Sequence, residues 1–213
     1  MKTILCYGDS NTHGYNPSNR RRYPYDIRWT GILQKMLGEE YLVIEEGCNG
    51  RTTMFNYPDE PWKNGMSYLK PCLHSHKPID YVILMLGTND LKEIFNATSE
   101  KIADNAGKIV DEINKFLSEG QGFKPKIVLV SPIEVGEGIS TSFFGDQFKE
   151  DSIPRSKQFA KYYKEIADDR GCIYVDAATV AKVSPDDSLH LSVESHKALA
   201  EKIYQTILQE EGK

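Results

Sequence analysis

Three residue types that together perform nucleophilic catalysis occur in two distant parts of this sequence. Ser10 follows an apolar run near the N-terminus, and Asp187 and His190 lie three residues apart near the C-terminus. A serine is a poor nucleophile at neutral pH unless a base accepts its proton, and a histidine base works best when a carboxylate orients its second ring nitrogen. In a single turn, Asp187 and His190 can face the same way. We therefore predict that Ser10, His190 and Asp187 form a catalytic triad.

Such a triad also needs hydrogen-bond donors for the negative charge of a tetrahedral intermediate. Ser10 offers its own backbone N–H at a strand-to-helix turn. Gly50 can bring a backbone N–H close because it has no Cβ, and Asn89 can supply a side-chain amide. We predict that Ser10, Gly50 and Asn89 form the oxyanion hole.

Each of these residues also has an ordinary structural interpretation. Ser10 can cap the helix that follows it, His190 can be a surface histidine, and Asp187 can be one acid of an acidic loop. Asn89 is a common turn residue. The combination favours catalysis, because the motifs follow successive predicted strands in order.

The elements that must position these residues alternate along the chain. Short, continuously apolar runs predict buried parallel strands at residues 3–7, 42–44, 81–86, 126–130 and 172–175. Apolar residues three and four apart predict helices between the later strands, with weaker patterns at 27–37 and 198–208. This alternation predicts a three-layer α/β/α fold, in which ligands bind beyond the carboxyl ends of the strands. Residues 134–153 form a long, glycine-rich and aromatic connection, which is typical of a lid or binding loop.

The composition excludes several classes of protein. A net charge of −5 over 213 residues lacks the basic excess that nucleic acids or anionic membranes require. The longest apolar run, residues 81–86, is far shorter than the roughly 20 residues of a membrane-spanning helix. The N-terminal apolar stretch is too short for a signal peptide. We expect a cytoplasmic protein with one domain, residues 1–213, and with neither nucleic-acid nor membrane partners.

Metal and cofactor motifs are weak in this sequence. The four cysteines, at 6, 48, 72 and 172, have no metal-ligand spacing and are interpreted as reduced, buried thiols. His74-Ser75-His76 has no accompanying ligand motif, so we interpret it as a solvated turn. Arg28 and Arg51 could contact substrate or another subunit, but such arginines more often form structural pairs. We therefore expect neither a metal nor a cofactor.

The order of the motifs resembles that of the GDSL or SGNH hydrolases. The family's blocks are Gly-Asp-Ser, a glycine after the second strand, Gly-x-Asn-Asp and Asp-x-x-His, and all four are present. Within that superfamily the chain is most similar to the arylesterase or acyltransferase type. The similarity covers nearly the whole chain, through Ile4-Leu5-Cys6-Tyr7-Gly8-Asp9-Ser10, Asp26-x-Arg28-Trp29-Thr30-Gly31, Val43-Ile44-Glu45-Glu46-Gly47, Arg51-Thr52-Thr53, Asn64-Gly65-x-Ser67-Tyr68-Leu69 and Met85-Leu86-Gly87-Thr88-Asn89-Asp90.

The resemblance implies the same triad and oxyanion hole, no cofactor, and a flavodoxin-like five-stranded parallel sheet in the order 2-1-3-4-5. Three positions depart from the family pattern. Asn11 replaces the name-giving leucine, Gly50 stands where close relatives can carry alanine, and His13-Gly14-Tyr15 replaces a Trp-Gly-Trp.

We expect a serine esterase that forms an acyl-enzyme from a short-chain, small-molecule ester and passes the acyl group to water or an alcohol. The polar edges of Asn11, His13 and Tyr15 favour water as the acceptor. One alternative is a carbohydrate-ester deacetylase with the same triad, and another is a non-catalytic protein that binds a small ligand. We also expect a homo-oligomer, with Phe143, Phe144 and Phe148 as exposed contact residues.

Overall fold

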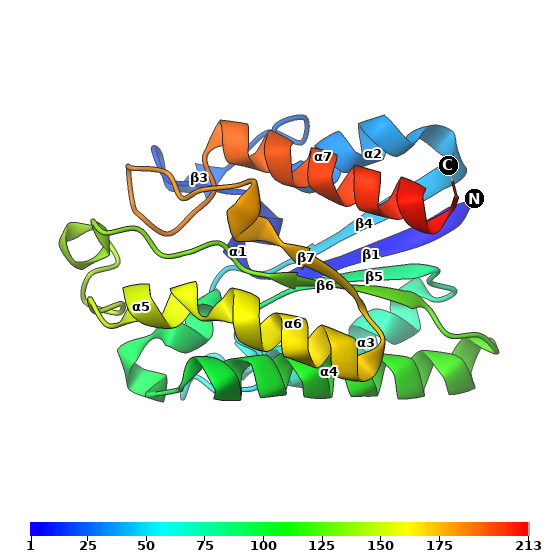
Figure 1. Ribbon diagram of the computed structural model, residues 1–213, viewed down its shortest axis with the longest axis horizontal. Coiled ribbons are helices and arrows are strands. Elements are labelled where there is room, and N and C mark those ends of the chain that lie inside the picture. Colours follow the sequence, from blue (N-terminus) through cyan, green and yellow to red (C-terminus); the bar gives the residue numbers. More distant parts are fainter. Residues whose placement is uncertain (213) are drawn as a thin grey trace.

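Five parallel strands form the central sheet of the protein (Figure 1). The structure is a computed structural model and describes residues 1–212. The sheet strands are β1 (Lys2–Gly8), β4 (Tyr41–Gly47), β5 (Tyr81–Met85), β6 (Lys126–Ser131) and β7 (Ile173–Asp176), in the spatial order β4-β1-β5-β6-β7. If only these five are counted, the order is 2-1-3-4-5. The predicted flavodoxin-like sheet is therefore confirmed.

The middle strand, β1, shows why a continuous apolar run forms here. Successive side chains of a strand point to opposite faces, so both faces of a covered strand must be apolar. Ile4 and Cys6 belong to one hydrophobic core, whereas Leu5 and Tyr7 belong to the other, and all four are fully buried. The two cores hold the strand in register, with Ile4 opposite Val43 on one side and opposite Tyr81 on the other.

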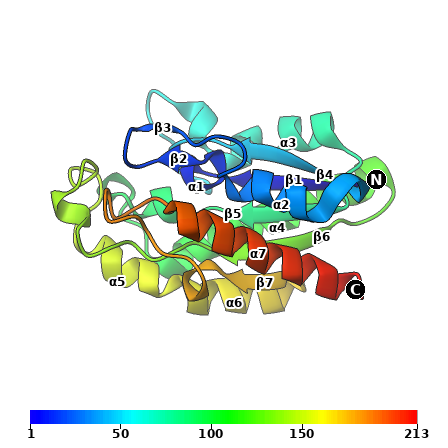
Figure 2. The ribbon, with the colours of Figure 1, turned by 90° about the horizontal axis from the view of Figure 1, so that it is seen from above.

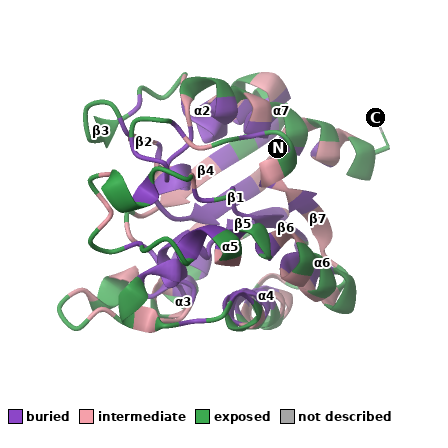
Figure 3. Ribbon diagram, turned by 60° about the vertical axis from the view of Figure 1, so that its left-hand side comes forward, coloured by how far each residue is buried: buried purple, intermediate pink, exposed green. Residues whose placement is uncertain are grey.

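Helices cover both faces of the sheet. α2 (Trp29–Leu37) and α7 (Val193–Glu210) run side by side over one face (Figure 2). α3 (Gly65–His76), α4 (Ser99–Gln121) and α6 (Phe159–Arg170) cover the other, so the three-layer prediction is confirmed. Figure 3 shows the consequence for burial, with buried strands between helices whose outer surfaces are exposed.

Several short elements complete the chain. β2 (Tyr15–Asn16) and β3 (Arg21–Arg22) form a small antiparallel pair that was not predicted, and α1 (Ser10–His13) and α5 (Ser152–Lys157) are short helices. Single turns of 3₁₀ helix are η1 (Gly38–Glu40), η2 (Pro61–Lys63), η3 (Thr88–Leu91), η4 (Glu93–Phe95), η5 (Ile139–Thr141) and η6 (Ala177–Thr179). In the described part of the chain, no helix is both long and apolar enough to cross a membrane.

Two local predictions were wrong. His74-Ser75-His76 is the last turn of α3 rather than a solvated turn, and His76 hydrogen-bonds to Glu46 of β4. In the long connection, Phe143 is 61% exposed, but Phe148 is fully buried and Phe144 is half-buried. Phe148 is a core residue because the connection folds back onto the helix layer instead of extending into solvent.

The carboxyl ends of the strands bring the predicted site residues to one edge of the sheet. The approach of α1 to β4 requires a glycine at position 47. A Cβ built there would lie 2.1 Å from the backbone nitrogen of His13 and 2.6 Å from its Cα. The absence of a side chain at Gly47 therefore sets the position of the helix that begins at Ser10.

We predict that Gly47→Ala destabilises the protein by about 1–3 kcal/mol, because the added methyl group must displace backbone atoms. It should also reduce ester turnover by moving α1. Gly120→Ala is the matched control, since its Cβ meets only the end of the Lys77 side chain at 3.5 Å. Urea unfolding and an esterase assay measure both effects. An unchanged Gly47→Ala protein would contradict this account of the packing.

Candidate active site

Ser10 is the first residue of α1, directly beyond the end of β1. Asp9 caps this helix, because its side chain accepts a hydrogen bond from the backbone N–H of Asn11 at 2.9 Å and its carbonyl accepts from Thr12 and His13. The first N–H groups of a helix have no partner within the helix. The N–H of Ser10 is thus available to a ligand beside its hydroxyl group.

The structure brings the three predicted triad residues together. The Oγ of Ser10 lies 2.8 Å from Nε2 of His190, and Nδ1 of His190 lies 2.6 Å from Oδ2 of Asp187. All three residues are buried, with 3–7% of their surface exposed. These distances are within normal hydrogen-bond range for a nucleophile, a base and an orienting carboxylate.

Asp187 is held as an ionised carboxylate. Burial by itself would raise its pKa, but several hydrogen bonds outweigh burial and place the pKa below its usual range. The donors are the His190 ring and the backbone N–H groups of Leu189 and His190, at 3.0 and 2.9 Å. An ionised Asp187 accepts a hydrogen bond from the N–H at Nδ1 of His190. The other ring nitrogen, Nε2, then carries no hydrogen and is the acceptor that faces Ser10.

The turn that carries Asp187 and His190 is closed by backbone hydrogen bonds. Ser188 has a φ of 59°, in the left-handed region that is uncommon for residues other than glycine. Its N–H donates to Ser184, and its carbonyl accepts from Gly136 at 2.8 Å. Ser184 in turn donates to the carbonyl of His190 at 2.6 Å. This tight turn lets residues three apart present both side chains in one direction.

Asn11 has a role that sequence reasoning missed. Its side-chain oxygen accepts a hydrogen bond from the backbone N–H of Leu191 at 2.9 Å, and the residue is 3% exposed. Asn11 therefore ties the helix of Ser10 to the turn of His190. The signal in the sequence was an amide in the place of an apolar residue, next to the nucleophile.

Two aromatic rings confine His190. The ring of Tyr15 lies 4.2 Å from the His190 ring between centroids, and that of Phe144 lies at 5.3 Å. The expectation that Asn11, His13 and Tyr15 all present polar edges to the site is wrong for the first two. Neither Asn11 nor His13 is among the residues that line the cavity at Ser10, whereas Tyr15 is.

The predicted oxyanion donors line the same cavity, which has a volume of about 200 Å³. Gly50 has a φ of +79°, a conformation that favours glycine, and Asn89 lies on η3 after β5. The Asn89 amide donates one hydrogen bond to the Arg51 carbonyl at 3.2 Å. Its second hydrogen is free for a ligand, because an amide nitrogen carries two donors. Ser10, Gly50, Asn89 and His190 thus surround one cavity.

Comparison with known proteins gives the family. The model of the GDSL-like lipase/acylhydrolase family matches residues 6–198, which is most of the chain. The chain belongs to the GDSL-like lipase/acylhydrolase family. This membership places it among carboxylic ester hydrolases, as the order of its motifs predicted.

Three relatives are informative. The GDSL chain is 30% identical over 220 residues to an acetylxylan esterase of Xylanibacter ruminicola, with 96% of the chain covered but only 42% of that longer protein. It is 35% identical to Est24, a carbohydrate acetylesterase from Sinorhizobium meliloti, with 98% and 99% of the two chains covered and a TM-score of 0.92. An aryl esterase of M. smegmatis matches at 32% identity, with the same coverage and the same TM-score.

Below the oxyanion donors of this GDSL chain lies Arg51, which is 3% exposed. Its Nη1 donates to the carbonyls of Gly8, at 3.0 Å, and Glu46, and its guanidinium lies over the rings of Tyr7 and Tyr68. Arg51 therefore links the ends of β1 and β4 and does not line the cavity. The expected structural interpretation also holds for Arg28, which pairs with Glu45 at 2.8 Å.

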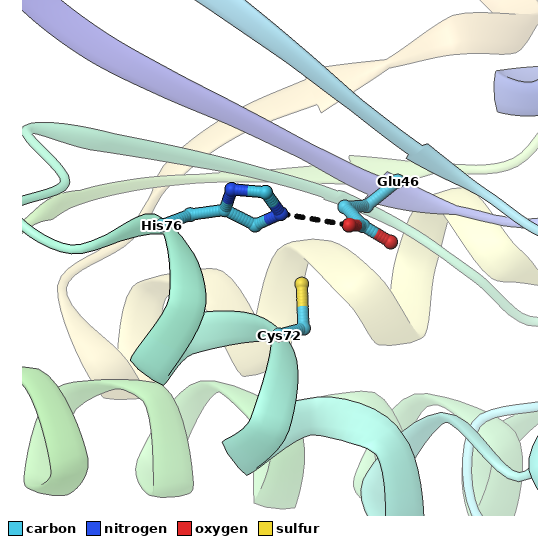
Figure 4. A group of neighbouring side chains, drawn as sticks. All are labelled: Glu46, Cys72 and His76. Carbon is cyan, nitrogen blue, oxygen red and sulfur yellow. Dashed lines mark hydrogen bonds and ion pairs between the residues drawn. The ribbon is translucent and has the colours of Figure 1, made fainter.

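One group of side chains has the donor atoms of a metal site (Figure 4). Glu46, Cys72 and His76 place a carboxylate oxygen, a sulfur and a ring nitrogen within 4.8 Å of one another, and Nε2 of His76 lies 2.8 Å from Glu46. Burial raises the pKa of Cys72 to about 12, and the positive charge of nearby Arg51 lowers it only in part. The negative charge of Glu46 raises the pKa of the thiol as well. We interpret the cluster as a structural contact that joins the last turn of α3 to β4 through His76 and Glu46.

Two buried acids lie next to the oxyanion residues in the chain, Asp90 beside Asn89 and Asp9 beside Ser10. Asp90, next to Asn89, accepts the backbone N–H of Thr53 at 3.0 Å and also the Thr53 hydroxyl. Burial, with a smaller contribution from nearby Asp9, raises the pKa of Asp90 to about 7 in spite of these hydrogen bonds. Burial likewise raises the pKa of Asp9 to about 6. The segment after Gly50 is thus anchored to η3 by a carboxyl group that binds a proton near neutral pH.

We predict that Asp90 makes the protein less stable as pH rises. An aspartate of the unfolded chain titrates near ~3.9, so between about pH 4 and 7 the native chain holds a proton that the unfolded chain has released. The free energy of unfolding contributed by this group then falls with rising pH.

Asp90→Asn should reduce the loss of stability between pH 5 and pH 8 by about 1 kcal/mol or more, because the amide cannot ionise. It keeps an oxygen that accepts the N–H of Thr53. Urea unfolding at the two pH values measures the difference. An identical loss in the two proteins would reject the raised pKa.

Proposed function

We propose that this GDSL hydrolase is a serine esterase that cleaves short-chain acyl esters through an acyl-enzyme on Ser10. The observation that carries the proposal is the hydrogen-bonded series from Ser10 through His190 to Asp187, which borders the cavity of Gly50 and Asn89. The catalytic roles of these residues are part of the proposal.

In the first half of the reaction, His190 Nε2 takes the hydroxyl proton of Ser10 while Oγ attacks the ester carbonyl carbon. The carbonyl oxygen becomes an oxyanion, which the N–H groups of Ser10 and Gly50 and the amide of Asn89 stabilise. Asp187 stabilises the imidazolium that forms. The tetrahedral intermediate then breaks its bond to the alcohol oxygen, which leaves with the proton from His190.

In the second half, water enters and His190 removes its proton. The hydroxide oxygen bonds to the acyl carbon, and the bond to Ser10 Oγ breaks as His190 returns a proton to the serine. An alcohol in place of water gives a new ester. The phenol of Tyr15 is a polar group on the cavity wall, whereas Phe144 is apolar. The cavity can therefore admit either water or an alcohol as the acyl acceptor.

A second candidate narrows the substrate to acetylated carbohydrates. It is favoured by the similarity to an acetylxylan esterase and to the carbohydrate acetylesterase Est24. Acetate release from acetylated xylan and from acetylated monosaccharides tests it. Turnover of aryl acetates without any release from these sugars would leave the general esterase as the better proposal.

A protein that only binds a small ligand is the remaining alternative. Fluorophosphonate labelling of folded protein separates it from an esterase, because the reagent needs an activated serine. Labelling of Ser10 in the native chain, and none in Ser10→Ala or His190→Ala, supports the esterase. We also retain a homo-oligomer as a proposal, on the exposed ring of Phe143; a light-scattering mass equal to one 24.2 kDa chain would exclude it.

We predict different effects for two adjacent acids. Asp187→Asn should lower kcat by roughly 10³- to 10⁴-fold, because the orienting carboxylate is lost. Asp186→Asn is the matched control, since Asp186 is exposed and, in the described part of the chain, its side chain accepts a hydrogen bond only from the Ser18 hydroxyl at the surface. Its kcat should stay within about threefold of wild type, as for other surface changes. Equal losses, measured on p-nitrophenyl acetate, would reject the assignment of Asp187.

The cavity volume predicts the acyl chain length. A space of about 200 Å³ is shared by the acyl and alcohol groups, so an octanoyl chain cannot be buried in it. We expect kcat/KM for p-nitrophenyl esters to fall by about tenfold or more between butyrate and octanoate. Phe144→Ala should reduce this difference by opening the wall. A constant kcat/KM through octanoate would contradict a pocket of this size.

A further inference from the structure

One positive charge in the active-site cavity has no directly bonded partner among the described residues. Lys92 lies between η3 and η4, three residues after Asn89, and lines the cavity together with Ser10. It is only 9% exposed. Among the described residues, its ammonium group makes no hydrogen bond and has no carboxylate within 4 Å. Its near neighbours are the rings of Tyr57, at 5.0 Å from Nζ, and Phe148, at 5.7 Å.

The other lysine of the cavity is in a different situation. Nζ of Lys63 lies 2.6 Å from a carboxylate oxygen of Glu60, so its charge is balanced. Lys92 therefore carries the excess positive charge of this wall. A buried ammonium without a partner is costly, and buried charges in proteins are normally paired. The missing partner of Lys92 would lie in the cavity, on a bound molecule.

We propose that Lys92 binds a carboxylate of the substrate, so that the preferred ester is one that also carries an anionic carboxylate. This inference rests on the proposed esterase function. Nζ offers three donors and a single positive charge, and a charge-assisted hydrogen bond to a carboxylate is among the stronger ones. A phosphate or sulfate fits less well, because no arginine and no second unpaired lysine line this cavity.

The position of Lys92 places this carboxylate close to the reacting ester. Lys92 and Asn89 share one turn, in which the N–H of Lys92 donates to the Asn89 carbonyl. An anion on Lys92 and an oxyanion on Asn89 would thus belong to one small molecule. The carboxylate can be on the acyl group or on the alcohol group of the ester. Each case is tested with its own pair of substrates, one charged and one neutral.

The test compares a charged and a neutral ester in the same protein. For the alcohol side the pair is 4-acetoxybenzoate and 4-acetoxybenzamide; for the acyl side it is p-nitrophenyl hemisuccinate and its methyl ester. In Lys92→Met the ratio of kcat/KM, charged over neutral, should fall by about ten- to a hundredfold in at least one pair, as expected for loss of a charged hydrogen bond. A general loss of activity cancels in this ratio.

Two further variants make the result specific. Lys92→Arg keeps the positive charge and should retain most of the preference. Lys115→Met removes one positive charge from the exposed surface of α4, and its ratio should match that of wild type. If Lys115→Met lowers the ratio as much as Lys92→Met, the preference comes from the overall charge and the inference is wrong.

The pH dependence gives a readout that a structural lysine would not produce. Burial, together with the charge of Lys63, lowers the pKa of Lys92 to about 8. In wild type the charged-over-neutral ratio should therefore fall between pH 7 and pH 9.5, as the ammonium loses its proton, and in Lys92→Met it should stay flat. The titratable groups near Lys92 are shared by both proteins: Asp9, Tyr57 and Glu60 beside it, and Tyr15, Lys63 and His190 on the cavity wall.

A binding measurement separates failure of this inference from failure of the esterase proposal. Calorimetry with 4-acetamidobenzoate and 4-acetamidobenzamide, which lack the ester, should give tighter binding of the anion to wild type but not to Lys92→Met. If wild type hydrolyses no ester, the proposed function fails and this measurement alone decides the anion site. If neutral esters are hydrolysed while turnover and binding show no Lys92-dependent preference, the anion site is rejected and the esterase stands.

Discussion

The hydrogen bond between Ser10 and His190 joins residues 180 positions apart, and the geometry of the site depends on it. A second hydrogen bond of the same separation, from Leu191 to Asn11, lies next to it in the chain. Two adjacent bonds between the same two segments resist sliding and rotation better than one. The helix of Ser10 and the turn of His190 are thereby fixed as a unit. The position of that unit is set by three features: β1, the closed turn at Ser188 and the absence of a side chain at Gly47.

Charge in the site follows from burial and from what each acid can bind. Asp187 receives hydrogen bonds from a ring and two backbone N–H groups, so its pKa is low in spite of burial. Among the described residues no histidine ring donates to Asp9 or Asp90, and burial raises their pKa values to about 6 and 7. Near neutral pH, Asp187 behind the histidine is therefore ionised, whereas Asp90 still holds its proton in part. In the proposed mechanism this arrangement favours an imidazolium at His190 and limits repulsion of the oxyanion by Asp90, which is next to Asn89.

The sequence predicts residues that lie in short motifs at strand ends, because parallel strands bring their carboxyl ends to one edge whatever the details of packing. Ser10, Gly50, Asn89 and the pair Asp187 and His190 are of this kind, and the structure gathers them. Residues whose role depends on side-chain direction could not be predicted. Asn11 contacts Leu191 instead of the cavity, and Phe148 is buried although its neighbour Phe143 is exposed. The position of Lys92 could not be predicted either, because the sequence around an isolated lysine does not show that its side chain is buried without a partner.

The polar residues of the site and the residues of the opposite cavity wall come from different parts of the chain, and this separation affects substrate specificity. The polar groups stand on strand ends that both cores hold rigidly. Much of the opposite wall comes from the connection of residues 134–153, through Phe144, Gln147 and Phe148. That connection is anchored by the burial of Phe148 and by a hydrogen bond from Glu93 to the Gln147 carbonyl. A second contact, the guanidinium of Arg20 over the exposed ring of Phe143, holds the middle of the connection. Substitutions between these two anchors can reshape the cavity around the substrate and leave the hydrogen bonds of Ser10, His190 and Asp187 intact.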